Sequence, residues 1–363
     1  MKQEQSVLVA VSSTLDRIRT EYAGLLQSTP LSLQELFEPE NFRFDEFCKD
    51  FNPHPRSAEL TVLAETFGRE HGIWLPNAKH HVTCALYLYP TAEFDRMVAI
   101  MKNLVIGFYL NDVMGRDIFK DLSTDQKLVS RRIIQNMASL NENLLVPFGA
   151  DRIETLNAEI LTEFKDNSPA VWFSTFLKIY CHHLDITHTD RNVKALGHIP
   201  DLYEYIENRC HYAGVHHVVM WIEYNTGLFL DWGMLKDVGL YESFKRLHWL
   251  TAAFGCLSND LFSFEKEVID QESDSNLVMI LVLNDPGLSL QGSITRSCSI
   301  VRALVLEFMQ LMREAQNHPN LTANLEIHLT GICRCVQATW LWHCHSKRYK
   351  RPGSLWHETT GGK

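Results

Sequence analysis

The sequence predicts an all-α protein. Apolar residues recur at helical spacing along most of the 363-residue chain, and no linker divides it. Hydrophobic residues make up 45% of the chain, which is ample for a buried core, and charged residues make up 21%, which argues against disorder. We therefore expect one large helical domain.

Charge and the distribution of apolar residues exclude some partners. The net charge of −10 argues against nucleic acid, because binding a phosphate backbone needs a concentrated basic face. No apolar run approaches the length that spans a bilayer, and the apolar patch near Glu4 is too short for a signal peptide. We expect a cytoplasmic protein with no stable membrane insertion, and we leave open whether it forms a homodimer.

Cysteine and histidine do not indicate a metal site. The nine cysteines are an odd number without a CxxC pair, which is typical of reduced core thiols. The pairs His80-His81, His182-His183 and His216-His217 lack a carboxylate or cysteine at ligand spacing, so we do not expect them to bind a metal.

The N-terminal part of the chain is predicted to contain two longer helices. Residues 5–27 carry helical apolar spacing, and residues 30–51 are predicted to be mostly irregular. Pro53 stops any earlier helix, and Ser57 is the expected N-cap of a helix over 58–70.

The most apolar helix is predicted over roughly 93–119. It is apolar nearly all round, as expected for a helix in the middle of a bundle. Its apolarity breaks at Asn111-Asp112 and again at Arg116-Asp117. A carboxylate after so long an apolar run is costly to bury alone, so it should meet a cation or line a water-filled cleft. The plainer alternative is that both aspartates pair with neighbouring basic residues.

Helical patterns continue through the rest of the chain. A polar run at 269–276 offers Asp274 and Ser275 as caps for a helix that begins at Leu277. The other predicted helical regions are roughly 125–185, 215–258, 293–315 and 321–349.

The stretch NDLFSFEKE, residues 259–267, carries the most specific pattern. On an α-helix Asn259, Ser263 and Glu267 are spaced i, i+4 and i+8, so an amide, a hydroxyl and a carboxylate share one face. Mg²⁺ prefers such hard oxygen ligands, and Lys266 adds a cation for a phosphate oxygen. The spacing alone would arise by chance in about one chain in ten, and then a solvated polar face explains it equally well. Asp260 and the base at 266 lower that rate to roughly one in a thousand.

This stretch resembles NDxxSxxKE, the second metal-binding motif of class I terpene synthases (terpene cyclases) of the microbial type. Other features resemble that family in the same order along the chain: Asn52-Pro53-His54, the segment Cys84 to Pro90, Arg209 followed by Gly214, and Trp342 before Arg348-Tyr349. The resemblance covers about residues 50–350. It implies a single class I terpenoid synthase α-helical bundle with a central active-site cavity. We accordingly expect one catalytic domain over 1–363, with an N-terminal segment of 1–50 and a short tail of 351–363.

The first metal-binding motif departs from the family. Its usual form is DDxxD or DDxxxD/E, whose first aspartate bridges two Mg²⁺ ions, and this chain has no aspartate pair there. If Asp112 leads, Asp117 falls where the longer form has its last acid; if Asn111 leads, a neutral amide stands where a bridging carboxylate is needed. We favour Asp112 as the ligand because it keeps the charge. Asn111 and Asp117 are then expected to orient the site.

The resemblance implies a reaction and roles for single residues. The expected reaction is Mg²⁺-dependent ionisation of farnesyl or geranylgeranyl diphosphate, cyclisation of the carbocation to a terpene, and release of diphosphate. Three Mg²⁺ ions are expected, held by Asp112, Asn259, Ser263 and Glu267. The substrate diphosphate is expected to contact Arg209, Lys266, Arg348 and Tyr349. Phe108 and Trp342 are expected as pocket aromatics, although aromatic residues at helical spacing are at least as often plain core.

Two other classes of function remain open from sequence. A chain-elongating prenyltransferase (isoprenyl diphosphate synthase) shares the fold and ions, but the resemblance implies that it would carry a second aspartate-rich motif in place of Asn259, Ser263 and Glu267. A non-catalytic helical scaffold would bind no diphosphate with Mg²⁺. The substrate chain length, the product skeleton and the quenching of the final cation by proton loss or by water depend on pocket shape.

Overall fold

The chain folds as a bundle of α-helices, in a computed structural model that describes residues 2–115, 118, 121–188 and 192–361. Over these residues no β-strand forms, and extended pairing is limited to isolated bridges between Leu31 and Trp356 and between Arg351 and Thr360. The all-α class is therefore confirmed. The elements are α1 (Lys2–Leu25), α2 (Leu33–Phe37), α3 (Phe44–Cys48), α4 (Ser57–Glu70), α5 (Ala78–Val82), α6 (Cys84–Leu88), α7 (Phe94–Met114), α9 (Thr124–Ala138), α10 (Arg152–Asp166), α11 (Ala170–Thr187), α12 (Val193–Leu196), α13 (Leu202–Tyr212), α14 (Val215–Thr226), α15 (Trp232–Asp237), α16 (Tyr241–Phe264), the π-helix η1 (Glu265–Asp270), α17 (Leu277–Asn284), α18 (Leu290–Gln316), α19 (Ala323–His345) and the 3₁₀ helix η2 (His357–Thr359).

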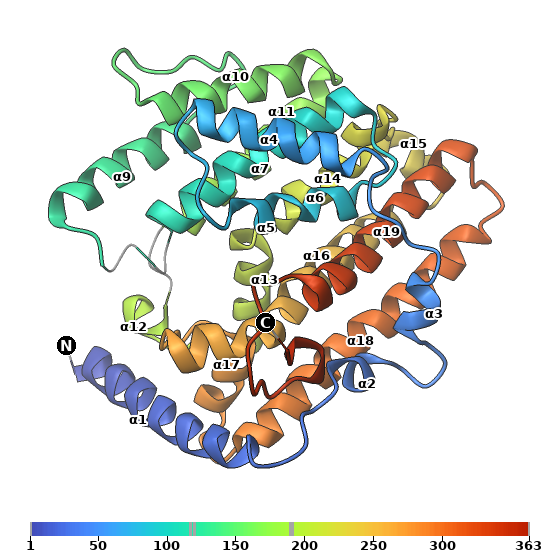
Figure 1. Ribbon diagram of the computed structural model, residues 1–363. Coiled ribbons are helices and arrows are strands. Elements are labelled where there is room, and N and C mark those ends of the chain that lie inside the picture. The colour runs from blue at the N-terminus through green and yellow to red at the C-terminus, as the bar shows by residue number, and fades with distance from the viewer. Residues whose placement is uncertain (1, 116–117, 119–120, 189–191, 362–363) are drawn as a thin grey trace.

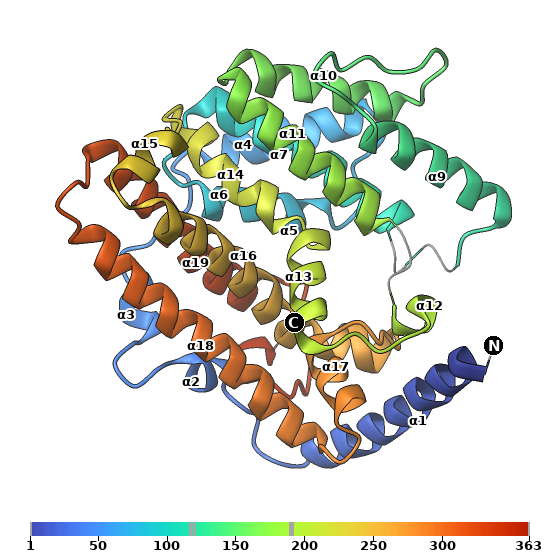
Figure 2. The same ribbon diagram turned by 180° about the vertical axis from the view of Figure 1, so that it is seen from behind.

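The helices surround a centre to which α7, α13, α14, α16 and α19 contribute. Figure 1 shows α4, α7, α10 and α11 in the upper half, α16 and α19 across the middle, and α1 and α17 below them. Figure 2 shows from behind that α14 lies in the upper half near α7 and α11, and that α13 lies between this half and α17. α16 packs on α14, α18 and α19, so the helix that carries the most specific motif lies inside the bundle.

Helix α7 has the length and composition of a membrane span, which the sequence analysis did not anticipate. Half of its most apolar window is buried inside the protein, where the helix packs on α4, α5 and α10. Burial on several sides accounts for an apolar surface that runs nearly all round this helix.

The predicted helix at Leu277 begins at that residue, and the helix predicted over 58–70 begins one residue earlier, but the predicted capping residues of both are wrong. Ser57 is the first residue of α4 and donates its hydroxyl to the carbonyl of His54, so it does not cap that helix. Asn276 caps α17 by accepting the amide of Val278, whereas the Asp274 carboxylate accepts the amide of Val193 at the start of α12.

Other predicted bounds shift by several residues. The most apolar helix ends at Met114 rather than near 119, and the Gly115 amide donates to the carbonyl of Asn111 over 3.1 Å. The entry segment of 30–51 contains two short helices, α2 and α3, whose Phe37 and Phe44 are fully buried.

Both terminal segments contribute to the buried core. Val11 and Ile18 of α1 are fully buried, and so is Trp356 of the C-terminal tail. The Leu31 amide donates to the carbonyl of Leu355 over 2.8 Å, which joins the chain after α1 to that tail. Residues outside the predicted core of 50–350 therefore pack against the same bundle.

Candidate active site

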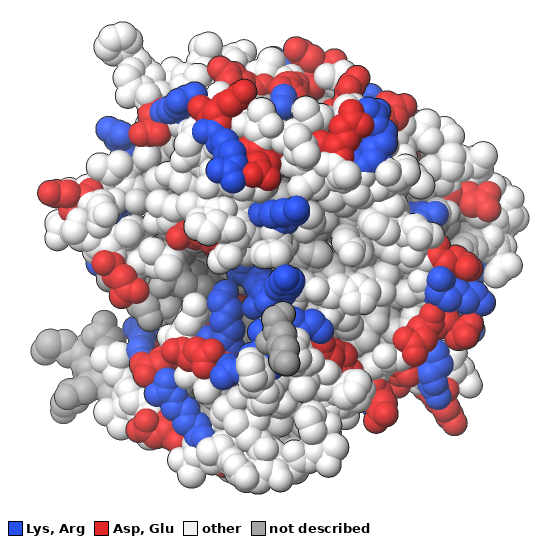
Figure 3. All heavy atoms as spheres, in the orientation of Figure 1, with Lys and Arg blue, Asp and Glu red and all other residues white. Residues whose placement is uncertain are grey.

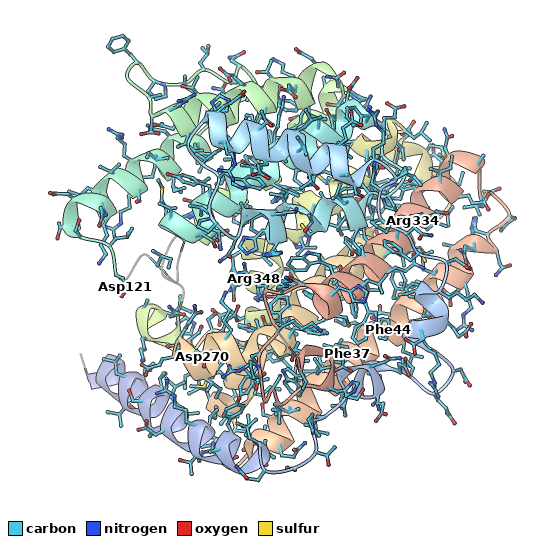
Figure 4. All side chains as sticks on the ribbon, in the orientation of Figure 1. Phe37, Phe44, Asp121, Asp270, Arg334 and Arg348 are labelled. Carbon is cyan, nitrogen blue, oxygen red and sulfur yellow. The ribbon has the colours of Figure 1, made fainter. Side chains whose placement is uncertain are left out.

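A cavity of about 310 Å³ lies at the centre of the bundle. Residues of α6, α7, α11, α13, α14, α16 and α19 line it, and both predicted aromatics, Phe108 and Trp342, are in its wall. Gly107 is also in the wall, and a Cβ atom placed there would meet open space. Figure 3 shows basic side chains gathered at the centre of one face, where Figure 4 labels Arg348.

Asn259 contacts two other predicted site residues, Arg209 and Tyr349. Its Oδ1 accepts a hydrogen bond from Arg209 Nη2 over 3.0 Å, and its Nδ2 donates to the Tyr349 hydroxyl over 2.7 Å. The same Nδ2 lies 3.3 Å from His343 Nε2. Arg209, Asn259 and Tyr349 all line the cavity, so α13, α16 and the segment after α19 meet at this point.

Asp260 is the functional residue that sequence reasoning missed. The sequence motif includes this residue without indicating a role for it, and in the structure it is fully buried. Its carboxylate accepts hydrogen bonds from Arg209 Nε at 2.7 Å, the Tyr205 hydroxyl at 2.5 Å and the Leu277 amide at 2.9 Å. Burial opposes the charged guanidinium, but the Asp260 carboxylate outweighs it and raises the pKa of Arg209 well above its ordinary value. The only signal for this pair in the sequence was an acid inside an otherwise apolar helix.

The α-helix that carries the predicted row of oxygen ligands ends at Phe264, before Glu267. An α-helix would place Glu267 about 80° around its axis from Asn259, since eight residues advance by about 100° each. The chain instead forms the π-helix η1, whose wider i to i+5 turns advance each residue by less. This swings Glu267 back towards the line of Asn259, and both residues line the cavity.

Ser263 and Lys266 stand beside that row. Ser263 is buried, and its hydroxyl donates to the backbone carbonyl of Asn259 over 2.7 Å. The hydroxyl proton is used within the helix, and the oxygen can still act as an acceptor or a metal ligand. Lys266 is half-buried and close enough to His81 to lower the pKa of that imidazole. Neither side chain is among the described residues that line the cavity.

The first motif reaches the second through His81 and Arg348. Asp112 accepts the Asn111 amide at its Oδ1 over 2.9 Å, and its Oδ2 lies 3.5 Å from His81 Nδ1. Burial, followed by the charge of Arg348, lowers the pKa of His81 to about 4, so the ring is neutral at pH 7. Its Nε2 accepts from Arg348 Nη1 over 2.6 Å, which leaves the proton on the nitrogen that faces Asp112. The ring of Phe108 lies 4.8 Å from the same imidazole.

The structure places Asn111 and Asp112, the first two polar residues of this motif, next to His81. Asn111 lines the cavity, whereas Asp112 lies behind it against His81. Asp117 lies outside the described residues, as do its neighbours Arg116 and Lys120.

Neutral imidazoles form part of the cavity wall. Burial lowers the pKa of His183 to about 3 and the pKa of His188 to about 4. Gly214, the residue at the break between α13 and α14, has φ +73°. A Cβ atom there would lie 2.8 Å from His217 Cε1 and 2.9 Å from His183 Cε1, so only glycine fits both the backbone and the space. Among the described residues, no group of three His, Cys, Asp or Glu side chains has the arrangement to hold a metal.

The oxygen donors of the two motifs fit a hard divalent cation. Asn259 and Glu267 line one side of the cavity and Asn111 another, with the Asp112 carboxylate next to it. Amide, hydroxyl and carboxylate oxygens are the ligands that Mg²⁺ accepts, and they leave positions for substrate oxygens. The buried Arg209 and the half-buried Arg348 place two cations at the same end of the cavity.

The family model described as "Terpene synthase family 2, C-terminal metal binding" matches residues 102–307, which is more than half of the chain. The chain belongs to this terpene synthase family. The resemblance inferred from its motifs is thereby confirmed, and the family description supports a bound metal.

Two named terpene synthases resemble this chain along most of its length, and a third resembles less than half of it. The 10-epi-cubebol synthase of Sorangium cellulosum is 23% identical over 308 residues, covering 83% of this chain and 95% of the relative. The Delta(6)-protoilludene synthase of Stereum hirsutum is 21% identical over 333 residues, covering 88% and 85%. Sesquiterpene synthase 1 of Postia placenta is 28% identical over 161 residues, which is 43% of this chain and 45% of that protein.

Solved terpene synthase structures share the fold at low sequence identity. The a-eudesmol synthase structure superposes with a TM-score of 0.67 at 18% identity, covering 82% of this chain and 97% of that one. The linalool/nerolidol synthase of Streptomyces clavuligerus gives a TM-score of 0.66 at 16% identity, covering 81% and 97%.

The buried imidazole of His188 predicts a loss of stability in acid. Its Nδ1 lies 3.3 Å from the Met114 carbonyl, and its folded pKa of about 4 is below the unfolded value of about 6.5. Between these two pH values the unfolded chain binds a proton at His188 and the folded chain does not. The contribution of the neutral ring to the free energy of unfolding is therefore complete above about pH 6.5 and is lost as the pH falls towards 4.

We expect the stability advantage of the wild type over His188→Asn to shrink by about 1.4 kcal/mol per pH unit inside that window. Urea unfolding between pH 7.5 and 4 measures it. Leu184→Ala, which removes a buried neighbour without a titrating group, should lower stability by the same amount at every pH. Parallel curves for the wild type and His188→Asn would contradict the assignment.

Proposed function

We propose that the protein ionises farnesyl diphosphate in a Mg²⁺-dependent reaction and cyclises the resulting carbocation to a sesquiterpene. The observation that carries this is the distribution of charge in the cavity wall. Arg209, Glu267 and Arg348 are its charged side chains among the described residues, and Arg209 contacts Asn259 directly. The rest of the wall is uncharged and combines apolar and aromatic side chains with neutral imidazoles and a few amide and hydroxyl groups. Such a cavity suits a substrate with an anionic head and a hydrocarbon tail. The choice of a 15-carbon chain over geranylgeranyl diphosphate is supported by the relative named as a sesquiterpene synthase.

The charged end is suited to hold diphosphate as a leaving group. Arg209 and Arg348 supply guanidinium donors and Lys266 an ammonium group, while the Tyr349 hydroxyl supplies a neutral donor. Bound Mg²⁺, of which we infer three ions held by Asp112, Asn259, Ser263 and Glu267, would neutralise the diphosphate and favour heterolysis of its bond to carbon. No protein nucleophile is required for that step.

The apolar end is suited to protect a carbocation. The faces of Phe108 and Trp342, both in the cavity wall, stabilise positive charge without offering a lone pair. His183 and His188 do not add positive charge to this space, because their lowered pKa values keep them neutral at pH 7.

Product analysis tests this function directly. We expect a cyclic 15-carbon product from farnesyl diphosphate with Mg²⁺, little from geranyl or geranylgeranyl diphosphate, and none after chelation with EDTA. Gas chromatography of the extracts identifies the products. A product that appears only when isopentenyl diphosphate is added would show chain elongation instead. Absence of turnover with all three substrates would favour a scaffold.

Arg209 donates hydrogen bonds to both Asp260 and Asn259, which predicts that lysine cannot replace it. Arg209 contacts Asp260 through Nε and Asn259 through Nη2, and the ammonium group of lysine, a point charge on a shorter side chain, does not reproduce this fixed fork, so the contact with at least one of the two weakens. We expect Arg209→Lys to lower kcat by about 100-fold or more. Arg246→Lys is the matched control, because Arg246 forks to Glu307 on the surface and should leave turnover unchanged. Equal rates for the two variants would remove Arg209 from the site.

The register of the first motif can be decided by substitution. A bridging ligand must supply negative charge, so we expect Asp112→Asn to be inactive. Asn111→Ala should lose about 10-fold and remain active, and Asp117→Asn should fall between them, as is usual for residues that orient a ligand. Steady-state diphosphate release measures all three. If Asn111→Ala were inactive while Asp112→Asn turned over, Asn111 would be the leading ligand.

A further inference from the structure

The Glu265 carboxylate is buried beside the cavity without lining it. It is only 3% exposed and begins the π-helix that carries Glu267. Three donors meet it: the Tyr22 hydroxyl at 2.5 Å, the Ser354 hydroxyl at 2.5 Å and the Leu355 amide at 2.9 Å. A buried carboxylate with three donors is held in one position, because losing any of them leaves a charge poorly compensated.

These donors come from opposite ends of the chain. Tyr22 belongs to α1, and Ser354 and Leu355 belong to the tail that follows Arg348-Tyr349. Burial and the Glu265 carboxylate raise the pKa of Tyr22 well above its ordinary value, so the phenol remains a donor. We call Glu265, Tyr22, Ser354 and Leu355 the terminal clamp.

Further contacts tie the same two segments to the rest of η1. Arg19 of α1 donates from Nη2 to the Ile269 carbonyl over 2.8 Å, and Arg351 of the tail donates from Nη1 to Asp270 Oδ2 over 3.0 Å. Figure 4 labels Asp270 below Arg348, on the side of α1. Both ends of η1 are therefore held by segments that lie outside residues 102–307, the range matched by the family model.

The π-helical geometry explains why such support matters. π-Helical turns are rare and occur mostly as single turns within α-helices, so this one needs contacts from elsewhere to persist. Glu267 is two residues beyond Glu265, and its direction depends on the turn. The tail that supplies Ser354 and Leu355 follows directly after Tyr349. The Tyr349 hydroxyl in turn accepts a hydrogen bond from Asn259 Nδ2.

We propose that Glu265 is a positioning residue and that the terminal clamp sets the affinity of the Glu267 site for divalent metal. This rests on the proposed function only in taking Glu267 as a metal ligand. Glu265 contacts neither substrate nor metal; it acts by fixing the turn that aims Glu267 and the tail that carries Tyr349.

The test compares Glu265→Gln and Tyr22→Phe with the wild type. In Glu265→Gln an amide donor faces groups that are themselves donors, and in Tyr22→Phe one donor is removed at nearly constant shape. We expect the Mg²⁺ concentration for half-maximal diphosphate release to rise about 10-fold in the first and about 3-fold in the second. In both, kcat at saturating Mg²⁺ should stay within about 3-fold of the wild type.

A readout independent of turnover is Mn²⁺ binding in the presence of inorganic diphosphate, followed by electron paramagnetic resonance. The same order of weakening is expected there. If the wild type binds Mn²⁺ with diphosphate but turns over no prenyl diphosphate, the proposed function fails while the clamp is still tested. If the wild type binds no Mn²⁺ under these conditions, the clamp proposal is overturned as well.

Glu223→Gln is the matched control. Glu223 is also a buried carboxylate, and it accepts the Leu230 amide over 2.6 Å on α14, away from η1. Glu223→Gln should leave the metal requirement unchanged. If Glu265→Gln does not fold, Tyr22→Phe and Ser354→Ala decide. Folded clamp variants with the wild-type metal dependence, or a shift in Glu223→Gln of the same size, would overturn the proposal.

Discussion

The buried ion pair between Arg209 and Asp260 joins the helices on which the active site depends. It links α13 to α16, and the contacts of Asp260 with Tyr205 and the Leu277 amide add a second bond to α13 and one to α17. Removing one partner of such a pair costs about 3–5 kcal/mol, because the other charge stays buried. The same guanidinium holds the Asn259 amide. The stability of the bundle and the orientation of Asn259, which we propose as a metal ligand, therefore depend on the same few atoms.

Charged and neutral side chains lie in different parts of the site. Basic side chains gather at one end of the cavity, and the imidazoles along α11 and α14 stay neutral because burial disfavours their protonation. A net charge of −10 over the whole protein does not oppose an anionic substrate head, since local cations dominate at contact distance.

The fold class and the identity of the second motif could be predicted from sequence because both depend on local patterns. Apolar spacing reports a buried helix face, and the order of Asn259, Asp260, Ser263 and Glu267 is specific enough to indicate a family. The partner of Asp260, the role of His81 and the contacts of Glu265 could not be predicted, because each joins residues more than 50 apart in the chain. The π-helix also escaped prediction. Nothing in FEKEVID distinguishes it locally from an α-helix, and its support comes from both termini.

Two glycines in and beside the cavity wall differ in how much change they allow. At Gly214 the left-handed backbone and the rings of His183 and His217 leave no room for a side chain. At Gly107, on α7 next to Phe108, the space is open, so an added side chain would take up part of the cavity volume. The α7 side of the wall therefore tolerates a larger residue that reshapes the cavity, whereas the break between α13 and α14 tolerates none.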